Sequence, residues 1–206
     1  MDVERLIVGQ LATNCYLVRC SEDGEAVVID PGGEGEKIWS VIQNRGLNVR
    51  LIINTHGHGD HIAANGFLKA KTGAEVLIHP EDASMLTSPA RNLSAWINGG
   101  LVCPPADRLI KGDDEVTCGN VTFKVLATPG HTPGGISLWA DGVVFTGDTL
   151  FRGSIGRTDF PGGDYRLLLN SIRDKLLVLP SNTIVYPGHG PESNIGEERV
   201  TNPFLI

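Results

Sequence analysis

The chain has 206 residues, its 17 Lys+Arg and 24 Asp+Glu give a formal net charge of −7, and 41% of its residues are hydrophobic. This composition is that of an ordinary globular protein and excludes collagen-like and disordered classes. The negative charge opposes binding to nucleic acid or anionic lipid, and no apolar run approaches the roughly 18 residues of a membrane helix. Because the N-terminus also lacks a signal-peptide core, we expect one cytoplasmic domain over residues 1–206, with no membrane or nucleic-acid partner.

Short runs rich in β-branched residues alternate along the chain with segments of helical periodicity. The runs predict strands at residues 6–8, 16–18, 26–30, 51–54, 75–78, 121–126, 136–139, 143–146 and 183–186. Apolar residues at helical spacing predict helices over residues 35–44, 62–70 and 164–179. Strand clusters separated by single helices favour layered α and β elements over a simple βαβ series. The four cysteines form no Cys-x-x-Cys pair, so we expect reduced, structural thiols.

The most informative segment follows the apolar run 51–53 and reads Asn-Thr-His-Gly-His-Gly-Asp-His over residues 54–61. It places four potential metal ligands in six positions: His56, His58, Asp60 and His61. Imidazole and carboxylate groups suit Zn²⁺ or Fe²⁺. The glycines between them leave room for a tight loop. The segment therefore predicts a metal site at the end of a strand.

Three further segments share one pattern, in which a β-rich run ends in a glycine-containing turn and delivers a ligand-type residue. These residues are His131, Asp148 and His189. Ligands at strand ends of a layered fold converge at one rim, so we expect them to join the first four. His79 also follows a strand, but it has no partner motif, and we expect a structural role for it.

The succession of these seven residues resembles the metallo-β-lactamase superfamily along nearly the whole chain. The resemblance implies an α/β fold, a four-layer αββα sandwich with a metal site at one edge of the paired sheets. It also implies two divalent metal ions per chain, with zinc expected first and iron or manganese as alternatives. His56, His58 and His131 would hold the first ion, Asp60, His61 and His189 the second, and Asp148 would bridge them.

Residues 104–107 and 147–160 look like the glyoxalase II (hydroxyacylglutathione hydrolase) group. This similarity implies cleavage of a small-molecule acyl thioester by a hydroxide that bridges the two metals. Asp60 and Asp148 would orient that hydroxide and are the expected catalytic residues. The group's helical C-terminal extension has no counterpart after His189, so we do not expect strict specificity for glutathione.

Other polar residues near these motifs are candidates for supporting roles. Arg152 and Arg157 follow Asp148 and are candidates to bind a substrate carboxylate through their planar guanidinium groups. Asp30 and Asp159 are candidates to orient metal-binding imidazoles. We assign no residue to an organic cofactor, and the segment 94–101 is a candidate lid over the cleft.

Other functions within the resemblance stay open. Persulfide dioxygenase shares the His-x-His-x-Asp-His motif and a segment matching residues 156–160, but it uses a single iron and oxygen. A lactonase-type hydrolase of the same fold and a metal-binding protein without catalysis are further alternatives. The main lactamase class, which has cysteine at the position of Asp148, does not match. The acyl group, the thiol carrier and the oligomeric state are not predicted.

Overall fold

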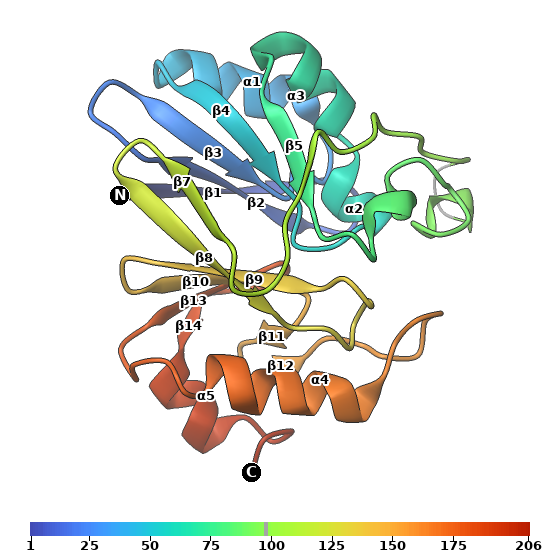
Figure 1. Cartoon of the computed structure of the whole chain (residues 1–206), viewed down its shortest axis with the longest axis vertical. Coiled ribbons are helices and arrows are strands. Elements are labelled where there is room, and N and C mark those ends of the chain that lie inside the picture. Colours follow the sequence, from blue (N-terminus) through green and yellow to red (C-terminus); the bar gives the residue numbers. More distant parts are fainter. Residues whose placement is uncertain (97–98) are drawn as a thin grey trace.

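Two six-stranded β-sheets face each other in the computed structural model, and helices cover the outer face of each sheet (Figure 1). The structure describes residues 1–96 and 99–206. This arrangement is the αββα sandwich that the resemblance implied, so the predicted fold class is confirmed. Part of the expected lid, residues 97–98, lies outside the described residues.

The first sheet begins with an antiparallel meander and continues as parallel strands. Its spatial order equals its chain order: β1 (Asp2–Val8), β2 (Thr13–Arg19), β3 (Glu25–Ile29), β4 (Asn48–Ile53), β5 (Glu75–Ile78) and β6 (Arg108–Leu109). Successive side chains of a strand point to opposite faces, and both faces of this sheet are covered. Val27 therefore packs between the sheets, whereas Val28 packs against the outer helices.

The second sheet is antiparallel except where β13 pairs with β10. In spatial order its strands are β14 (Ser193–Asn194), β13 (Ile184–Pro187), β10 (Val143–Gly147), β9 (Ile136–Ala140), β8 (Val121–Ala127) and β7 (Glu115–Cys118). A hairpin of β11 (Leu150–Phe151) and β12 (Ser154–Ile155) follows β10. The sequence predicted none of the strands β6, β7, β11, β12 and β14.

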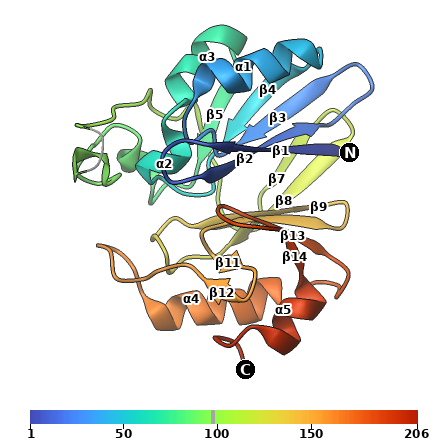
Figure 2. The same cartoon turned by 180° about the vertical axis from the view of Figure 1, so that it is seen from behind.

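Helices α1 (Gly35–Asn44) and α3 (Asn65–Thr72) cover the first sheet, and α4 (Tyr165–Ser171) and α5 (Ile195–Thr201) cover the second (Figure 2). Short helices complete the chain: α2 (Gly59–Ile62), the 3₁₀ turns η1 (Ala83–Met85) and η2 (Ser94–Trp96), and the π-helical turn η3 (Ile172–Leu176). Within the described parts of the chain, no helix is long and apolar enough to cross a membrane. The four cysteines are buried and free, as expected.

Two predicted helices differ from the observed ones. The helix expected over 62–70 is divided into α2 and α3, because the N–H of Ala64 donates to the carbonyl of Pro31 at 2.8 Å. The helix expected over 164–179 changes to a π turn after Ser171, where the N–H of Leu177 donates to the carbonyl of Ile172 at 2.9 Å. The apolar residues form the buried face of each segment, but the α-helical geometry does not extend along all of it.

The pairing of the strands brings their carboxyl ends to one edge of the sandwich. In the first sheet β3 and β4 run parallel. In the second sheet β8 and β10 are both antiparallel to β9, and β13 is parallel to β10, so these three share one direction. The loops after these strands therefore meet at that edge, which is where the sequence placed the ligand-type residues.

Candidate metal centre

All seven predicted ligand-type side chains meet at this edge of the sandwich. They form three overlapping groups whose ligand atoms lie within 4.8 Å of one another: His56, His58 and His131; His56, His61 and Asp148; and Asp60, His61 and His189. Since the groups share members, the side chains make one continuous cluster. Its residues come from loops and a short helix that follow strands of both sheets.

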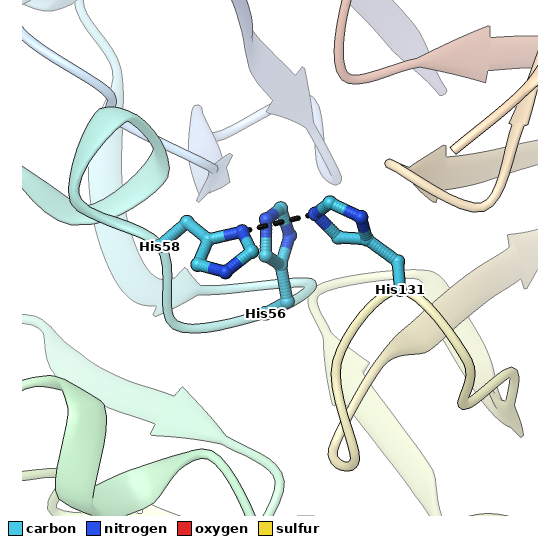
Figure 3. A group of neighbouring side chains, drawn as sticks. All are labelled: His56, His58 and His131. Atoms are coloured by element: carbon cyan, nitrogen blue, oxygen red, sulfur yellow. Dashed lines mark hydrogen bonds between the residues drawn. The ribbon is translucent and has the colours of Figure 1, made fainter. Parts of the chain in front are cut away.

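One half of the cluster consists of three buried histidines. The loop between β4 and α2 supplies His56 and His58, and the loop after β8 supplies His131. Their rings converge (Figure 3), with Nδ1 of His58 2.9 Å from Nε2 of His131. The ring of His56 lies edge-on to both, with centroids 4.8 Å away. This half presents imidazole nitrogens alone.

The other half combines imidazoles with carboxylates and is more open. Nε2 of His189 lies 3.3 Å from Nε2 of His61 and 3.3 Å from Oδ2 of Asp60. Asp148 lies between the two halves, because its Oδ2 is 3.6 Å from Nε2 of both His131 and His189. The side chains of Asp60 and His189 are 23% and 27% exposed, whereas His61 is fully buried. Solvent therefore reaches the cluster from the Asp60 and His189 side.

Hydrogen bonds to backbone carbonyls fix the tautomers of two histidines. Nδ1 of His131 contacts the carbonyl oxygen of Arg157 at 2.7 Å, and Nδ1 of His189 contacts that of Leu11 at 3.1 Å. A carbonyl can only accept, so the network assigns the proton to Nδ1 in both rings. Each Nε2 consequently carries a lone pair directed at the cluster.

Asp30 fixes the tautomer of His61 directly and that of His56 through Thr55. Its carboxylate accepts from Thr55 Oγ1 at 2.6 Å and from Nδ1 of His61 at 3.0 Å. Because the Thr55 proton is used in this way, its oxygen accepts from Nδ1 of His56 at 3.2 Å. In the neutral rings, Nε2 of His56 and Nε2 of His61 therefore also present lone pairs. The proposed orienting role of Asp30 toward an imidazole has this geometric support.

The donor set fits divalent metal ions. Nε2 of His56 and Oδ1 of Asp148 are buried without a hydrogen-bond partner among the described residues, and buried polar atoms left in this way are costly. Several converging nitrogen lone pairs and two carboxylates are ligands that suit Zn²⁺, Fe²⁺ or Mn²⁺. A bound cation would satisfy these atoms, so the cluster is a candidate divalent-metal centre.

The two halves differ in electrostatic character. Burial and the neighbouring histidines lower the pKa of His58 to about 3 and hold the pKa of His56 well below its ordinary value. Burial also acts to lower the pKa of His61, but Asp148, Asp60 and Asp30 outweigh it and raise this pKa well above its ordinary value. His56 and His58 are thus neutral at pH 7, whereas the carboxylates beside His61 favour positive charge there, which a bound cation would supply in place of a proton.

The predicted substrate-binding arginines lie outside the cluster. The guanidinium of Arg157 pairs with the carboxylate of Asp159 at 2.7 Å and stacks over the ring of Phe160 at 3.7 Å. Asp159 therefore contacts an arginine and not an imidazole. The guanidinium of Arg152 lies 3.7 Å from the carboxylate of Glu197 in α5. Substrate binding by either arginine stays a prediction.

The remaining histidine lies apart from the cluster. Nδ1 of His79 accepts from the N–H of Glu81 at 3.3 Å in the turn after β5. His79 belongs to none of the ligand groups that the described residues form. This placement agrees with the structural role expected for it.

Sequence reasoning missed several residues that hold the ligands in place. The hydroxyl of Thr13 donates to Oδ2 of Asp60 at 3.3 Å, and the hydroxyl of Tyr16 donates to the carbonyl of Pro187, two residues before His189, at 2.7 Å. The buried Asp82 accepts from backbone N–H groups of two ligand loops. Their sequence neighbourhoods carry no signal, because each contact joins distant segments.

The fold and this cluster define a class of protein, and residues 8–189 match the metallo-beta-lactamase superfamily. The chain belongs to that superfamily. YqgX of Bacillus subtilis, described as a probable metallo-hydrolase, is 41% identical and covers 100% of this chain and 98% of the relative. GloC of Haemophilus influenzae, described as a hydroxyacylglutathione hydrolase, is 38% identical with the same coverage.

Solved structures show the same architecture. The chain is similar to a structure described as BLEG-1 B3 metallo-beta-lactamase, with a TM-score of 0.95, 40% identity and 99% of each chain covered. It is similar to TTHA1623 in a di-iron-bound form, with a TM-score of 0.86, 38% identity, and 98% and 100% covered. It also resembles ETHE1 from Myxococcus xanthus, with a TM-score of 0.80, 33% identity, and 98% and 84% covered.

Proposed function

We propose that the protein is a metal-dependent hydrolase that cleaves small-molecule acyl thioesters at a binuclear centre. The observation that carries this proposal is the pair of adjoining ligand groups with Asp148 between them. The similarity to YqgX and to GloC, a hydroxyacylglutathione hydrolase, supports hydrolysis and the thioester bond. We further propose that residues 1–206 act as one domain.

In this proposal His56, His58 and His131 hold one divalent ion, and Asp60, His61 and His189 hold the second. Asp148 would contribute to both positions, since its Oδ2 is 3.6 Å from Nε2 of both His131 and His189. A single Zn²⁺ needs only three or four protein ligands, so seven ligand-type side chains favour two ions. The similarity to TTHA1623, described in a di-iron-bound form, supports the same number. Zinc is the metal we expect first, with iron or manganese as alternatives.

Bound ions would polarise the substrate carbonyl and lower the pKa of a water molecule. Asp60 and Asp148 would accept hydrogen bonds from that water and orient it. Burial acts to raise the pKa of both carboxyl groups, but His61 and its neighbours outweigh it, so both pKa values lie below the ordinary value. These residues are therefore acceptors and not acids at neutral pH.

The leaving group fits this assignment of roles. A thiol has a pKa of about 8 to 9, so its thiolate departs without much help from an acid. Ionised Asp60 and Asp148 give no such help, so a thioester suits the centre better than an amide does. The exposed side of the centre, at Asp60 and His189, is where the substrate would enter.

Arg157 is the better candidate of the two arginines for a substrate carboxylate. Its backbone carbonyl holds His131, so its side chain begins next to the centre. The contact with Asp159 is exposed, and a substrate carboxylate could replace that aspartate at the guanidinium group. Arg152 contacts Glu197 of α5 and is the second candidate.

A panel of substrates with an oxygen electrode tests the proposal. Purified metal-replete protein is given an S-acyl glutathione, a persulfide, a lactone and a β-lactam, with and without oxygen. We expect release of one thiol per thioester cleaved, at a rate that oxygen does not change. Asp60→Asn and His61→Ala should each lose most of that activity. Turnover that requires oxygen, with a single iron retained, would favour the dioxygenase alternative instead.

A further inference from the structure

Asp82 lies in the turn between β5 and η1 and is fully buried. Its Oδ2 accepts from the N–H of Gly57 at 3.0 Å, and its Oδ1 accepts from the N–H of Gly134 at 2.7 Å. Gly57 lies between His56 and His58, and Gly134 lies three residues after His131. One carboxylate therefore joins a ligand loop that follows a strand of the first sheet to one that follows a strand of the second.

The space around this carboxylate is closely packed. A Cβ atom on Gly134 would lie 2.6 Å from Oδ1 of Asp82, and a Cβ atom on Gly57 would lie 2.5 Å from Cβ of Met85. Such distances are too short for real side chains, so both positions need glycine. The two loops therefore contact Asp82 through main-chain atoms. Hydrogen bonds to a charged acceptor are stronger than those between neutral groups.

We infer that Asp82 is a positioning residue that sets the spacing of the three-histidine group of the centre. His58 and His131 lie on the two loops that Asp82 joins, and their facing nitrogens are 2.9 Å apart. A shift of either loop would change that separation. The inference rests on the metal centre proposed above, and it assigns Asp82 to one half of it.

The other half is held independently of Asp82. Asp30 contacts the ring of His61, Thr13 contacts Asp60, and the carbonyl of Leu11 contacts the ring of His189. Loss of the Asp82 contacts should therefore weaken one metal position and spare the other. A residue with only a general structural role would lower both affinities or neither.

Asp82→Asn tests the inference, because the amide keeps its size but has one acceptor oxygen where two N–H groups need one each. Glu198→Gln is the matched control. Glu198 is also fully buried and accepts from a backbone N–H, that of Gly153, but it contacts none of the ligand-bearing loops after β4 and β8. Co²⁺ affinities are measured by chelator competition on full-length protein, with unfolding of the metal-free variants followed in parallel.

We expect Asp82→Asn to weaken one Co²⁺ position by about 10- to 100-fold, as changes to groups that orient metal ligands typically do. The visible spectrum of its remaining Co²⁺ should match that of His131→Ala, in which the same group is broken. Glu198→Gln should keep wild-type Co²⁺ affinities even if the substitution lowers the free energy of unfolding of the metal-free protein. Wild-type affinities in Asp82→Asn, or equal losses in both variants, would overturn the inference. Wild-type protein that binds no Co²⁺ would instead overturn the metal centre itself.

Discussion

Replacing Asp30 by asparagine should change which nitrogen of His61 carries the proton. Asp30 is buried, and its carboxylate accepts from the N–H of Thr55 at 2.8 Å, from the Thr55 hydroxyl and from Nδ1 of His61. Its φ is 50°, a left-handed conformation that asparagine tolerates as well as aspartate. The substitution therefore tests the hydrogen bonds without adding backbone strain.

The magnitude follows from the contacts. In the Asp30→Asn variant the new amide oxygen can still accept from the Thr55 N–H, which leaves the amide nitrogen facing the Thr55 hydroxyl and the His61 ring. That nitrogen donates, so His61 must accept at Nδ1 and its proton moves to Nε2, which faces the cluster. Three charge-assisted bonds become neutral ones at a cost of about 1 kcal/mol each, so the free energy of unfolding should fall by about 3 kcal/mol. Metal affinity at His61 should fall about 10- to 100-fold.

Three measurements check this prediction. Urea unfolding of metal-free protein gives the stability change, chelator competition gives the affinity, and ¹⁵N NMR of the imidazole rings gives the tautomer of His61. Asp107→Asn is the control, since Asp107 accepts from the N–H of Val76 at 2.8 Å and lies outside the cluster. If His61 kept its proton on Nδ1 and both metal positions kept their affinity, the tautomer argument would be wrong.

Three other perturbations have defined outcomes. His131→Ala should lose metal and activity together, whereas His79→Ala should keep both; equal metal loss in the two variants, measured by elemental analysis, would contradict the division of the histidines. Chelation should lower the Tm of the wild-type protein, because ions that bind only the folded state stabilise it; an unchanged Tm in calorimetry would argue against a preformed centre. Asp164→Ala should cost about 1 kcal/mol in urea unfolding, since this residue caps α4 by accepting from the N–H of Leu167; no change would show that the cap is unimportant.

The spacing of apolar residues predicted a helix or strand well where burial of one face of that element decides its structure. The helix expected over 35–44 has the observed bounds, because Ile38 and Ile42 pack against the first sheet. Periodicity failed where hydrogen bonds between distant segments decide the structure. The N–H of Ala64 donates to the carbonyl of Pro31, and the next expected helix is divided at this point. The short strand β14 was also missed, since its two residues are too few to show an alternation.

The ligand-type side chains could be predicted because each stands at a strand end in a distinctive motif. Their tautomers could not be predicted from the sequence. The groups that fix them are Asp30, Thr55 and the carbonyls of Leu11 and Arg157. These contacts join loops that are far apart in the sequence, and a carbonyl acceptor leaves no trace in residue type. The role of Asp82 could not be predicted for the same reason, because Asp82 lies 25 residues from Gly57 and 52 residues from Gly134 in the sequence.

Stepwise metal reconstitution tests the central claim most directly. Metal-free protein is titrated with Zn²⁺, or with Fe²⁺ under anaerobic conditions, and thioester hydrolysis is measured after each addition. Two ions that share Asp148 should both be needed to acidify the attacking water and polarise the carbonyl. We therefore predict that the rate rises until two equivalents per chain are bound and is the same without oxygen. A rate that reaches its maximum at one equivalent, or that disappears when oxygen is removed, would contradict a binuclear thioester hydrolase.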